Sequence, residues 1–176
     1  MMSKKKETLK FIFSDLLSSI LAWSVFFYFR KNLEGKNFEI HDVNFLIGTV
    51  FIIFCWGIIY TLSGRYKNVF RTSRLQTFYS TFFQTFIGCA LIFFTIIIDD
   101  IKYQNNYYYY YYSISILFVT HFSILFISRY YLSSIIIKKI NSGKIGFNTI
   151  IIGCSEKAIK IFEKLEKSSK STGMKI

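Results

Sequence analysis

The sequence contains no proline, three cysteines and only ten acidic residues among 176. Proline often breaks membrane helices, so its absence predicts that long apolar segments form continuous helices. The cysteines, Cys55, Cys89 and Cys154, form no C-x-x-C pair, and we interpret them as small hydrophobic side chains. No cluster of histidine, cysteine and carboxylate residues has the spacing of a metal site. We therefore expect neither a disulfide nor a bound metal.

Charged residues are also scarce, at 18%, whereas 52% of the residues are hydrophobic and 20% are aromatic. This composition excludes an ordinary soluble domain and indicates a membrane protein. The net charge of +12 could suggest nucleic acid. However, the basic residues lie between long apolar segments, as in the cytoplasmic loops of membrane proteins. The predicted partner is the lipid bilayer, and we expect no binding to nucleic acid.

Four apolar segments are long enough to cross the hydrocarbon core as helices. The predicted spans are residues 11–29, 45–62, 78–98 and 107–128. The first span is too long for a signal peptide and lacks a clear cleavage site, so we expect it to stay in the mature protein. The fourth span begins with six tyrosines, residues 107–112, which favour the headgroup boundary. A low-complexity run without such a role is the alternative.

The distribution of charge predicts the orientation of the spans. If both termini are cytoplasmic, the cytoplasmic segments contain 18 of the 22 basic residues and four acids. The two outer loops then contain four basic residues and five acids. This distribution follows the positive-inside rule, whereas a three-span model would place the lysine-rich tail outside.

Several polar residues lie within or beside the spans. Asp15 is expected to reach toward the headgroups beside Lys10 or the basic loop, and the alternative is a contact with a lipid-linked substrate or a neighbouring helix. Gln84 and His121 are predicted to form hydrogen bonds between helices. Residues 129–140 could lie along the inner membrane surface or could simply continue the fourth helix.

The C-terminal tail resembles the start of an α/β domain. Residues 149–152 are predicted to form a strand buried on both faces, followed by Gly153, a helix from near Ser155 and a second strand that begins at residues 174–176. A nucleotide-binding turn reads G-x-G-x-x-G, but here the second glycine is Ser155 and the third is Ala158. We therefore interpret Gly153 and Ser155 as a vestigial cofactor-binding turn, and we expect no bound cofactor.

The predicted fold class is thus an all-α membrane bundle of four transmembrane helices, followed by the first β-α unit of an incomplete Rossmann-like α/β domain. The membrane domain covers residues 1–140, and the start of the cytoplasmic domain covers residues 141–176. A single strand and helix bury too little apolar area to fold alone. We expect the tail to be continued by further chain, to be completed by a separately encoded part or to dock on a partner.

Three segments together resemble the N-terminal half of bacterial polyprenyl glycosylphosphotransferases. They are WGIIYTLSGRYKNVFRTSRLQTF (Trp56–Phe78), the two aspartates after the third span, and KIGFNTIIIGCSEKA (Lys144–Ala158). Enzymes of this family transfer a sugar-1-phosphate from a nucleotide-sugar to undecaprenyl phosphate, which starts capsule or exopolysaccharide synthesis. The larger members have four helices, a Rossmann-like module and a C-terminal catalytic domain with an Asp–Glu pair.

The resemblance implies a multi-pass protein of the bacterial inner membrane that forms the anchoring and regulatory part of such a transferase. No residue of this chain corresponds to the catalytic domain, so no catalytic residue and no activity of the chain alone are implied. The implied partners are an undecaprenyl-phosphate-linked substrate and either the catalytic half or a second copy of the chain.

Two alternatives remain from the sequence. Membrane-bound nucleotide-sugar 4,6-dehydratases also begin with four helices before a Rossmann domain, but they would use NAD and a glycine-rich turn, which Gly-Cys-Ser at residues 153–155 matches poorly. A non-enzymatic membrane scaffold is the other alternative.

Overall fold

A computed structural model describes residues 4–33, 35, 39, 41–67, 69–70, 73–97, 107–153, 156, 159–160, 162–163 and 174–175. Four long helices dominate it. Their bounds are α1 (Lys4–Leu33), α2 (Val43–Leu62), α3 (Arg74–Ile92) and α4 (Tyr107–Asn141). The four predicted spans fall on these four helices in order. All four helices are long and apolar enough to cross a membrane, so the chain has the architecture of a multi-pass membrane protein.

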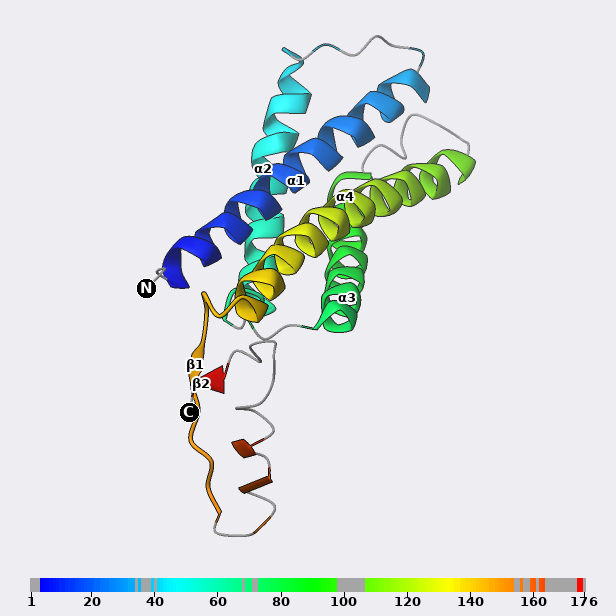
Figure 1. Cartoon of the computed structure of the whole chain (residues 1–176). Helices are drawn as coiled ribbons and strands as arrows, with labels where there is room; N and C mark the ends of the chain where they lie inside the picture. The colour runs from blue at the N-terminus through cyan, green and yellow to red at the C-terminus, as the bar shows by residue number, and fades with distance from the viewer. Residues whose placement is uncertain are drawn as a thin grey trace.

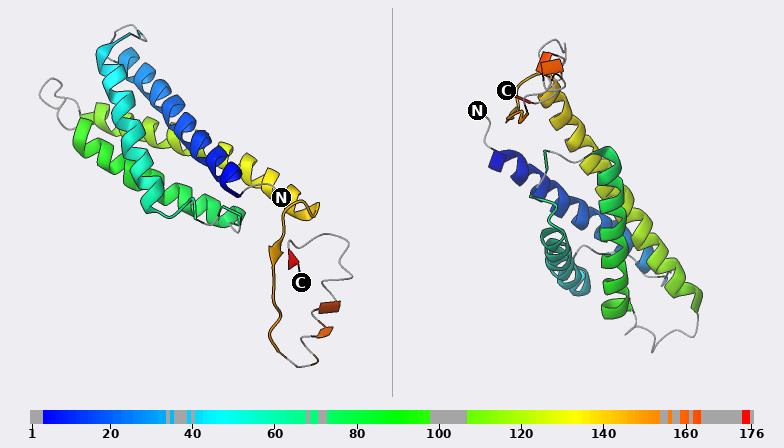
Figure 2. Two further views of the ribbon diagram at one scale, coloured as in Figure 1. Left: turned by 90° about the vertical axis from the view of Figure 1, so that its left-hand side faces the viewer. Right: turned by 90° about the horizontal axis from the view of Figure 1, so that it is seen from below.

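The helices pack around a central pair. Helices α1 and α4 run side by side (Figures 1 and 2) and make the most extensive contact in the bundle. Helix α2 packs against α1, α3 packs against α4, and α2 and α3 touch over a smaller area. The start of α1, the α2–α3 loop and the end of α4 lie at one end of the bundle, which we call the basic end.

Local signals in the sequence set the helix ends. The Asp42 carboxylate accepts a hydrogen bond of 2.9 Å from the backbone N–H of Asn44 at the start of α2. The hydroxyl of Ser73 accepts one of 3.1 Å from the backbone N–H of Gln76 at the start of α3. Gly143 follows the end of α4 with φ of 71°, the left-handed conformation in which glycine commonly ends helices.

Aromatic side chains fill the interfaces between helices. Phe118, Phe122 and Phe126 stack along one face of α4 at a spacing of four residues, with adjacent ring centroids 6.1 and 5.7 Å apart. From α3, Phe78 and Phe82 meet this ladder edge to face. Such edge-to-face pairs are favourable because the positive edge of one ring meets the negative face of the next.

Two glycines allow large rings to pack closely against neighbouring helices. A Cβ atom at Gly48 on α2 would collide with the indole of Trp23 on α1. A Cβ atom at Gly88 on α3 would likewise collide with the indole of Trp56 on α2. Both indoles are almost completely buried, so small residues at these positions set the distance between the helices.

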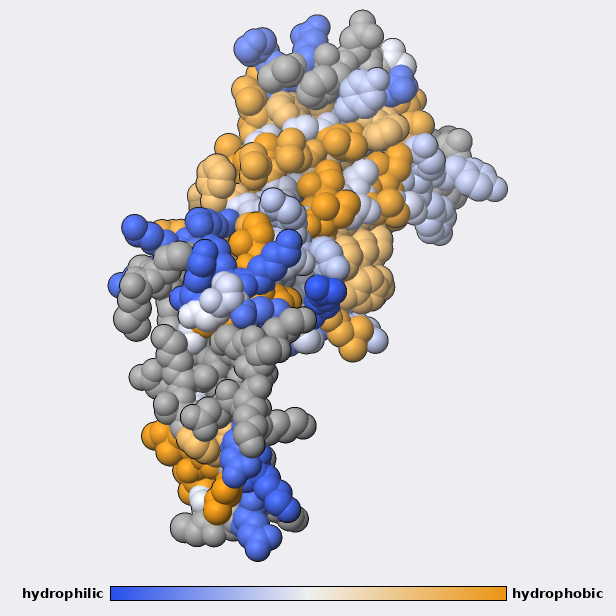
Figure 3. All heavy atoms as spheres, in the orientation of Figure 1, coloured by the Kyte–Doolittle hydropathy of each residue, from blue (hydrophilic) through white to orange (hydrophobic). Residues whose placement is uncertain are grey.

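The outer surface of the bundle is apolar, as Figure 3 shows over the helices. Many leucine, isoleucine and phenylalanine side chains there are at least half exposed, including Phe13, Phe54 and Leu62. An apolar surface of this extent is stable in lipid and not in water. At the start of α4, the side chains of Tyr108, Tyr111 and Tyr112 are exposed, as an aromatic anchor at the membrane boundary requires.

Helices α3 and α4 each differ in one detail from the spans predicted from the sequence. Helix α3 passes into a π-helical turn at Phe93–Ile97, so the third span changes its winding without any proline or glycine in that turn. Helix α4 continues without interruption to Asn141. Residues 129–140 therefore belong to the same helix as the fourth span and do not form a separate surface helix.

The tail forms a short parallel pair of strands, β1 (Phe147–Asn148) and β2 (Met174–Lys175). The second strand lies where the sequence predicts it, but the first lies two residues before the predicted range 149–152. Ile150 and Ile152 are 85% and 94% exposed, because no described residues cover either face of this segment. The helix predicted from near Ser155 falls largely outside the described residues, so a complete Rossmann-like unit stays a prediction.

Candidate functional site

The centre of the bundle contains an ion pair between α1 and α4. Arg129 donates from Nε to Asp15 Oδ1 at 2.9 Å and from Nη2 to Oδ2 at 2.8 Å. Both side chains are fully buried. The two parallel hydrogen bonds match the planar guanidinium to the planar carboxylate, the strongest geometry for such a pair.

The remaining donors of Arg129 bind α3. Its Nη1 donates to Thr81 Oγ1 at 3.1 Å and to Gln84 Oε1 at 2.7 Å. The guanidinium also lies over the Tyr60 ring of α2, with 4.7 Å between Cζ and the ring centroid. A cation at this distance is attracted to the ring face. Arg129 thus contacts all three other helices.

A second polar layer lies beside the ion pair. The Tyr60 hydroxyl is 2.9 Å from His121 Nε2 on α4 and 3.2 Å from Ser19 Oγ on α1. The His121 ring stacks on Trp56 with centroids 3.7 Å apart. The predicted role of Gln84 and His121 as partners in hydrogen bonds between helices is confirmed: Gln84 links α3 to α4, and His121 links α4 to α2.

The expectation for Asp15 was wrong. Its carboxylate does not reach the headgroups but points into the bundle, where Tyr66 also donates to Oδ2 at 3.1 Å. The positive-inside count places Arg129 on the cytoplasmic flank of the fourth span, yet its side chain is completely buried in the bundle. A carboxylate in a membrane is costly when isolated, and pairing with a second buried charge offsets that cost. The contact with a neighbouring helix was the correct alternative.

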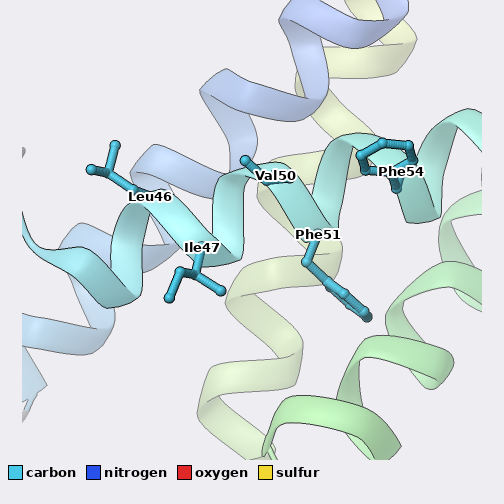
Figure 4. Close-up of a pocket in the computed structure, with 5 residues that line it drawn as sticks. All are labelled: Leu46, Ile47, Val50, Phe51 and Phe54. Carbon is cyan, nitrogen blue, oxygen red and sulfur yellow. The ribbon is translucent and has the colours of Figure 1, made fainter.

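Most polar groups of this network bind one another. Four N–H bonds of Arg129, both oxygens of Asp15 and the hydroxyl of Tyr60 are engaged by protein groups. The network is therefore suited to fixing the four helices relative to one another. A shallow groove of about 600 Å³ on α2 is lined only by apolar side chains, namely Leu46, Ile47, Val50, Phe51 and Phe54 (Figure 4). These five side chains can contact lipid chains, but none of them is a catalytic group.

Arg65, at the basic end, differs from Arg129. It follows α2 in the loop before α3, is 6% exposed, and lies over the Phe11 ring of α1 at 6.0 Å. Its Nε and Nη2 atoms have no hydrogen-bond partner among the described residues. Burial lowers the pKa of Arg65 to about 10, so the side chain is still a cation at neutral pH.

The predicted vestigial turn is only partly described. Gly153 is exposed and has φ of 143°, a conformation that favours glycine, and Ser155 lies outside the described residues. Cys89 is a buried free thiol and Cys55 is half-buried, as small apolar side chains would be, whereas Cys154 lies outside the described residues. The described part of the chain contains no group of three potential metal ligands.

The sequence contained a signal for the network that the predictions did not use. Thr77, Thr81 and Thr85 recur every four residues along α3, and all three are fully buried. Small polar side chains at helical spacing mark a helix face that packs against another helix in a membrane. Gly88 continues the same face. A buried cation on the partner helix can donate hydrogen bonds to such a face. The spacing of the threonines alone does not show which residue of α4 supplies that cation.

Comparison of the chain with known protein families, with curated proteins and with solved structures found no match.

Proposed function

We propose that the chain is the membrane-anchoring and regulatory part of a sugar transferase that moves a sugar-1-phosphate from a nucleotide-sugar to undecaprenyl phosphate. The proposal combines the family resemblance of residues 56–78 and 144–158 with the architecture of the bundle. The observation that supports this proposal most directly is the continuous helix α4, which joins the hydrogen-bonded core of the bundle to the tail.

Helix α4 contains 35 residues, which corresponds to about 52 Å at 1.5 Å per residue. The hydrocarbon core is about 30 Å thick, so α4 crosses it and continues well beyond it. Arg129, in the second half of α4, fixes that helix to the other three helices. A domain joined to the end of α4 would therefore be held at a defined distance and orientation from the bilayer, as a transferase that acts on a lipid requires.

The tail supports a cytoplasmic α/β module. Strands β1 and β2 pair in parallel, with Phe147 opposite Met174 and Asn148 opposite Lys175. Parallel neighbours need a long crossover connection, which is usually a helix. Asn148 and Met174 are separated by enough chain for the helix that the sequence predicts.

A transfer assay tests this proposal. Membranes that contain only this chain are expected to transfer no labelled sugar-phosphate to undecaprenyl phosphate, and measured transfer would contradict the assignment of catalysis to a separate domain. Reading the gene beyond codon 176 and its neighbouring reading frames is expected to reveal the rest of the α/β module and a catalytic domain with an Asp–Glu pair. If neither the gene nor its neighbours encode such a domain, the transferase proposal fails and a structural membrane protein is the better assignment.

A further inference from the structure

Two lysines from different helices share one buried carboxylate at the basic end of the bundle. Lys10 on α1 and Lys139 on α4 donate to the same atom, Glu7 Oε1, at 3.3 and 2.9 Å. The side chain of Glu7 is only 6% exposed, so it holds the two ammonium groups close to each other. One carboxylate balances only one of the two cations, and this group of three side chains therefore keeps a net positive charge.

Both lysines can be reached from outside the bundle. The side chain of Lys10 is 57% exposed and that of Lys139 is 23% exposed. An ammonium group has three N–H bonds, and each of these two has one acceptor among the described residues, the Glu7 carboxylate. Donors on both lysines therefore remain for an anion that approaches from the surface, and no cavity has to open to admit it.

The rest of the basic end adds positive charge and no exposed acid. Glu7 and Asp15 are the only acids of the segments that form this end, which are residues 4–15, 60–78 and 125–145. Asp15 is fully buried in its own ion pair. Each of the three segments carries an exposed lysine, namely Lys6, Lys67 and Lys138, and hydrophilic side chains gather at this end in Figure 3. Such a surface attracts the anionic headgroups of a lipid leaflet.

The side of α1 that carries Lys10 favours a lipid over a soluble anion. Lys10 directly precedes the apolar span that begins at residue 11, where the headgroup layer meets the hydrocarbon core. Phe13, Leu17 and Leu21 follow it at intervals of three or four residues, so they lie on the same side of the helix, and all three are exposed. A cation at the head of an exposed apolar stripe matches a phosphate group with its acyl chain, whereas a soluble anion would leave the stripe without a ligand.

We propose that Lys10 and Lys139 bind the phosphate of an anionic phospholipid in the leaflet at the basic end, with an acyl chain along Phe13, Leu17 and Leu21. Glu7 positions the two ammonium groups, and the phosphate balances the charge that Glu7 leaves over. The inference stands apart from the transferase proposal, because it rests on the bundle alone and requires no catalytic domain.

The test uses the whole chain purified in a neutral maltoside detergent and titrated with phosphatidylglycerol, with bound lipid counted by native mass spectrometry. Lys10→Gln is expected to weaken binding about fivefold, since one lysine contributes that much to the attraction of an anionic headgroup, and it leaves the Glu7–Lys139 ion pair in place. Lys5→Gln is the matched control. It removes one exposed cation from the same turn of α1, but two residues before Glu7 and so on the opposite side of the helix, and it is expected to leave binding nearly unchanged.

Further arms test the ligand and its location. Inorganic phosphate, which has no acyl chain, is expected to leave the binding of phosphatidylglycerol unchanged, and phosphatidylcholine, which has no net charge, is expected to bind more weakly. Lys10→Arg keeps the cation and should bind like wild type.

Phosphatidylglycerol with a photoreactive group in its acyl chain is expected to form cross-links within residues 11–21, located by peptide mass spectrometry. Equal binding by Lys10→Gln and Lys5→Gln, equal binding of the two lipids, competition by inorganic phosphate, loss of binding in Lys10→Arg, or cross-links confined to other helices would overturn the proposal.

Discussion

At the scale of single residues, the arginines of the bundle illustrate how burial and pairing decide a role. Arg129 is surrounded by acceptors from α1 and α3, so its charge is neutralised inside the bundle. Arg65 is nearly as buried, but its Nε and Nη2 atoms have no hydrogen-bond partner among the described residues. The same type of side chain therefore joins helices through hydrogen bonds at one position and packs over an aromatic ring at the other.

The Asp15–Arg129 pair should dominate the stability of the bundle. Asp15→Asn and Arg129→Gln each leave one buried charge without its partner, which is expected to cost about 3–5 kcal/mol. Unfolding of the purified chain in detergent measures this loss. The double variant should lose less than the sum of the single variants, because it leaves neither charge unpaired. Leu62→Ala, at an 83% exposed position, is the control. Single variants that unfold like Leu62→Ala would contradict a structural role for the pair.

At the scale of helices, close approach depends on glycines as much as on hydrogen bonds. Gly88→Ala would force a methyl group into the indole of Trp56, which also stacks on His121. Overpacking of this kind is expected to cost about 1–3 kcal/mol. Gly57→Ala on α2 is the matched substitution, because a methyl group there meets no atom within 4 Å. Thermal unfolding of both variants checks the prediction, and equal effects would show that the α2–α3 contact does not depend on Gly88.

The start of α2 should respond to acid. The Lys31 ammonium lies 2.8 Å from Asp42 Oδ2 and holds the pKa of Asp42 below its usual range. A carboxyl whose folded pKa is depressed stabilises the fold above the unfolded pKa of about 3.9, and this contribution disappears as the pH falls through the folded value. Asp42→Asn keeps the helix cap and removes the ion pair.

The expected result is a lower unfolding midpoint for Asp42→Asn than for wild type at pH 7, with the difference vanishing as the pH falls well below about 4. Lys31→Gln should reproduce the effect, because it removes the other partner. A difference in unfolding midpoint that persists in strong acid would show that the carboxylate charge does not cause the destabilisation.

At the scale of the whole molecule, the four helices and the charged loops predict a topology. Glu39 and Lys67 are exposed residues in the first and second loops, and the positive-inside rule places them on opposite sides of the membrane. In a cysteine-free background, Glu39→Cys is expected to react with a membrane-impermeant maleimide in intact spheroplasts. Lys67→Cys should react only after the membrane is opened. Labelling of both residues from the same side would refute the predicted orientation.

Hydropathy predicted the positions of the helices well because it is a local property. Each span is recognised from its own twenty or so residues, whatever the rest of the chain does. The ends were less accurate: α1 and α4 extend beyond their predicted spans, since polar residues at a helix end continue the winding outside the lipid. The first strand of the tail was displaced by two residues, because a continuous apolar run does not specify which of its residues find a pairing partner.

The sequence by itself determined that this chain is a membrane protein of four apolar helices with its cations concentrated in particular loops. It also indicated that Gln84 and His121 join helices, since polar groups in lipid must find partners within the protein. Only the tertiary structure decided which groups meet. Asp15 and Arg129 are separated by 114 positions, and their pairing follows from the antiparallel register of α1 and α4. No local pattern encodes that register, because it depends on which faces of two helices far apart in the chain pack together.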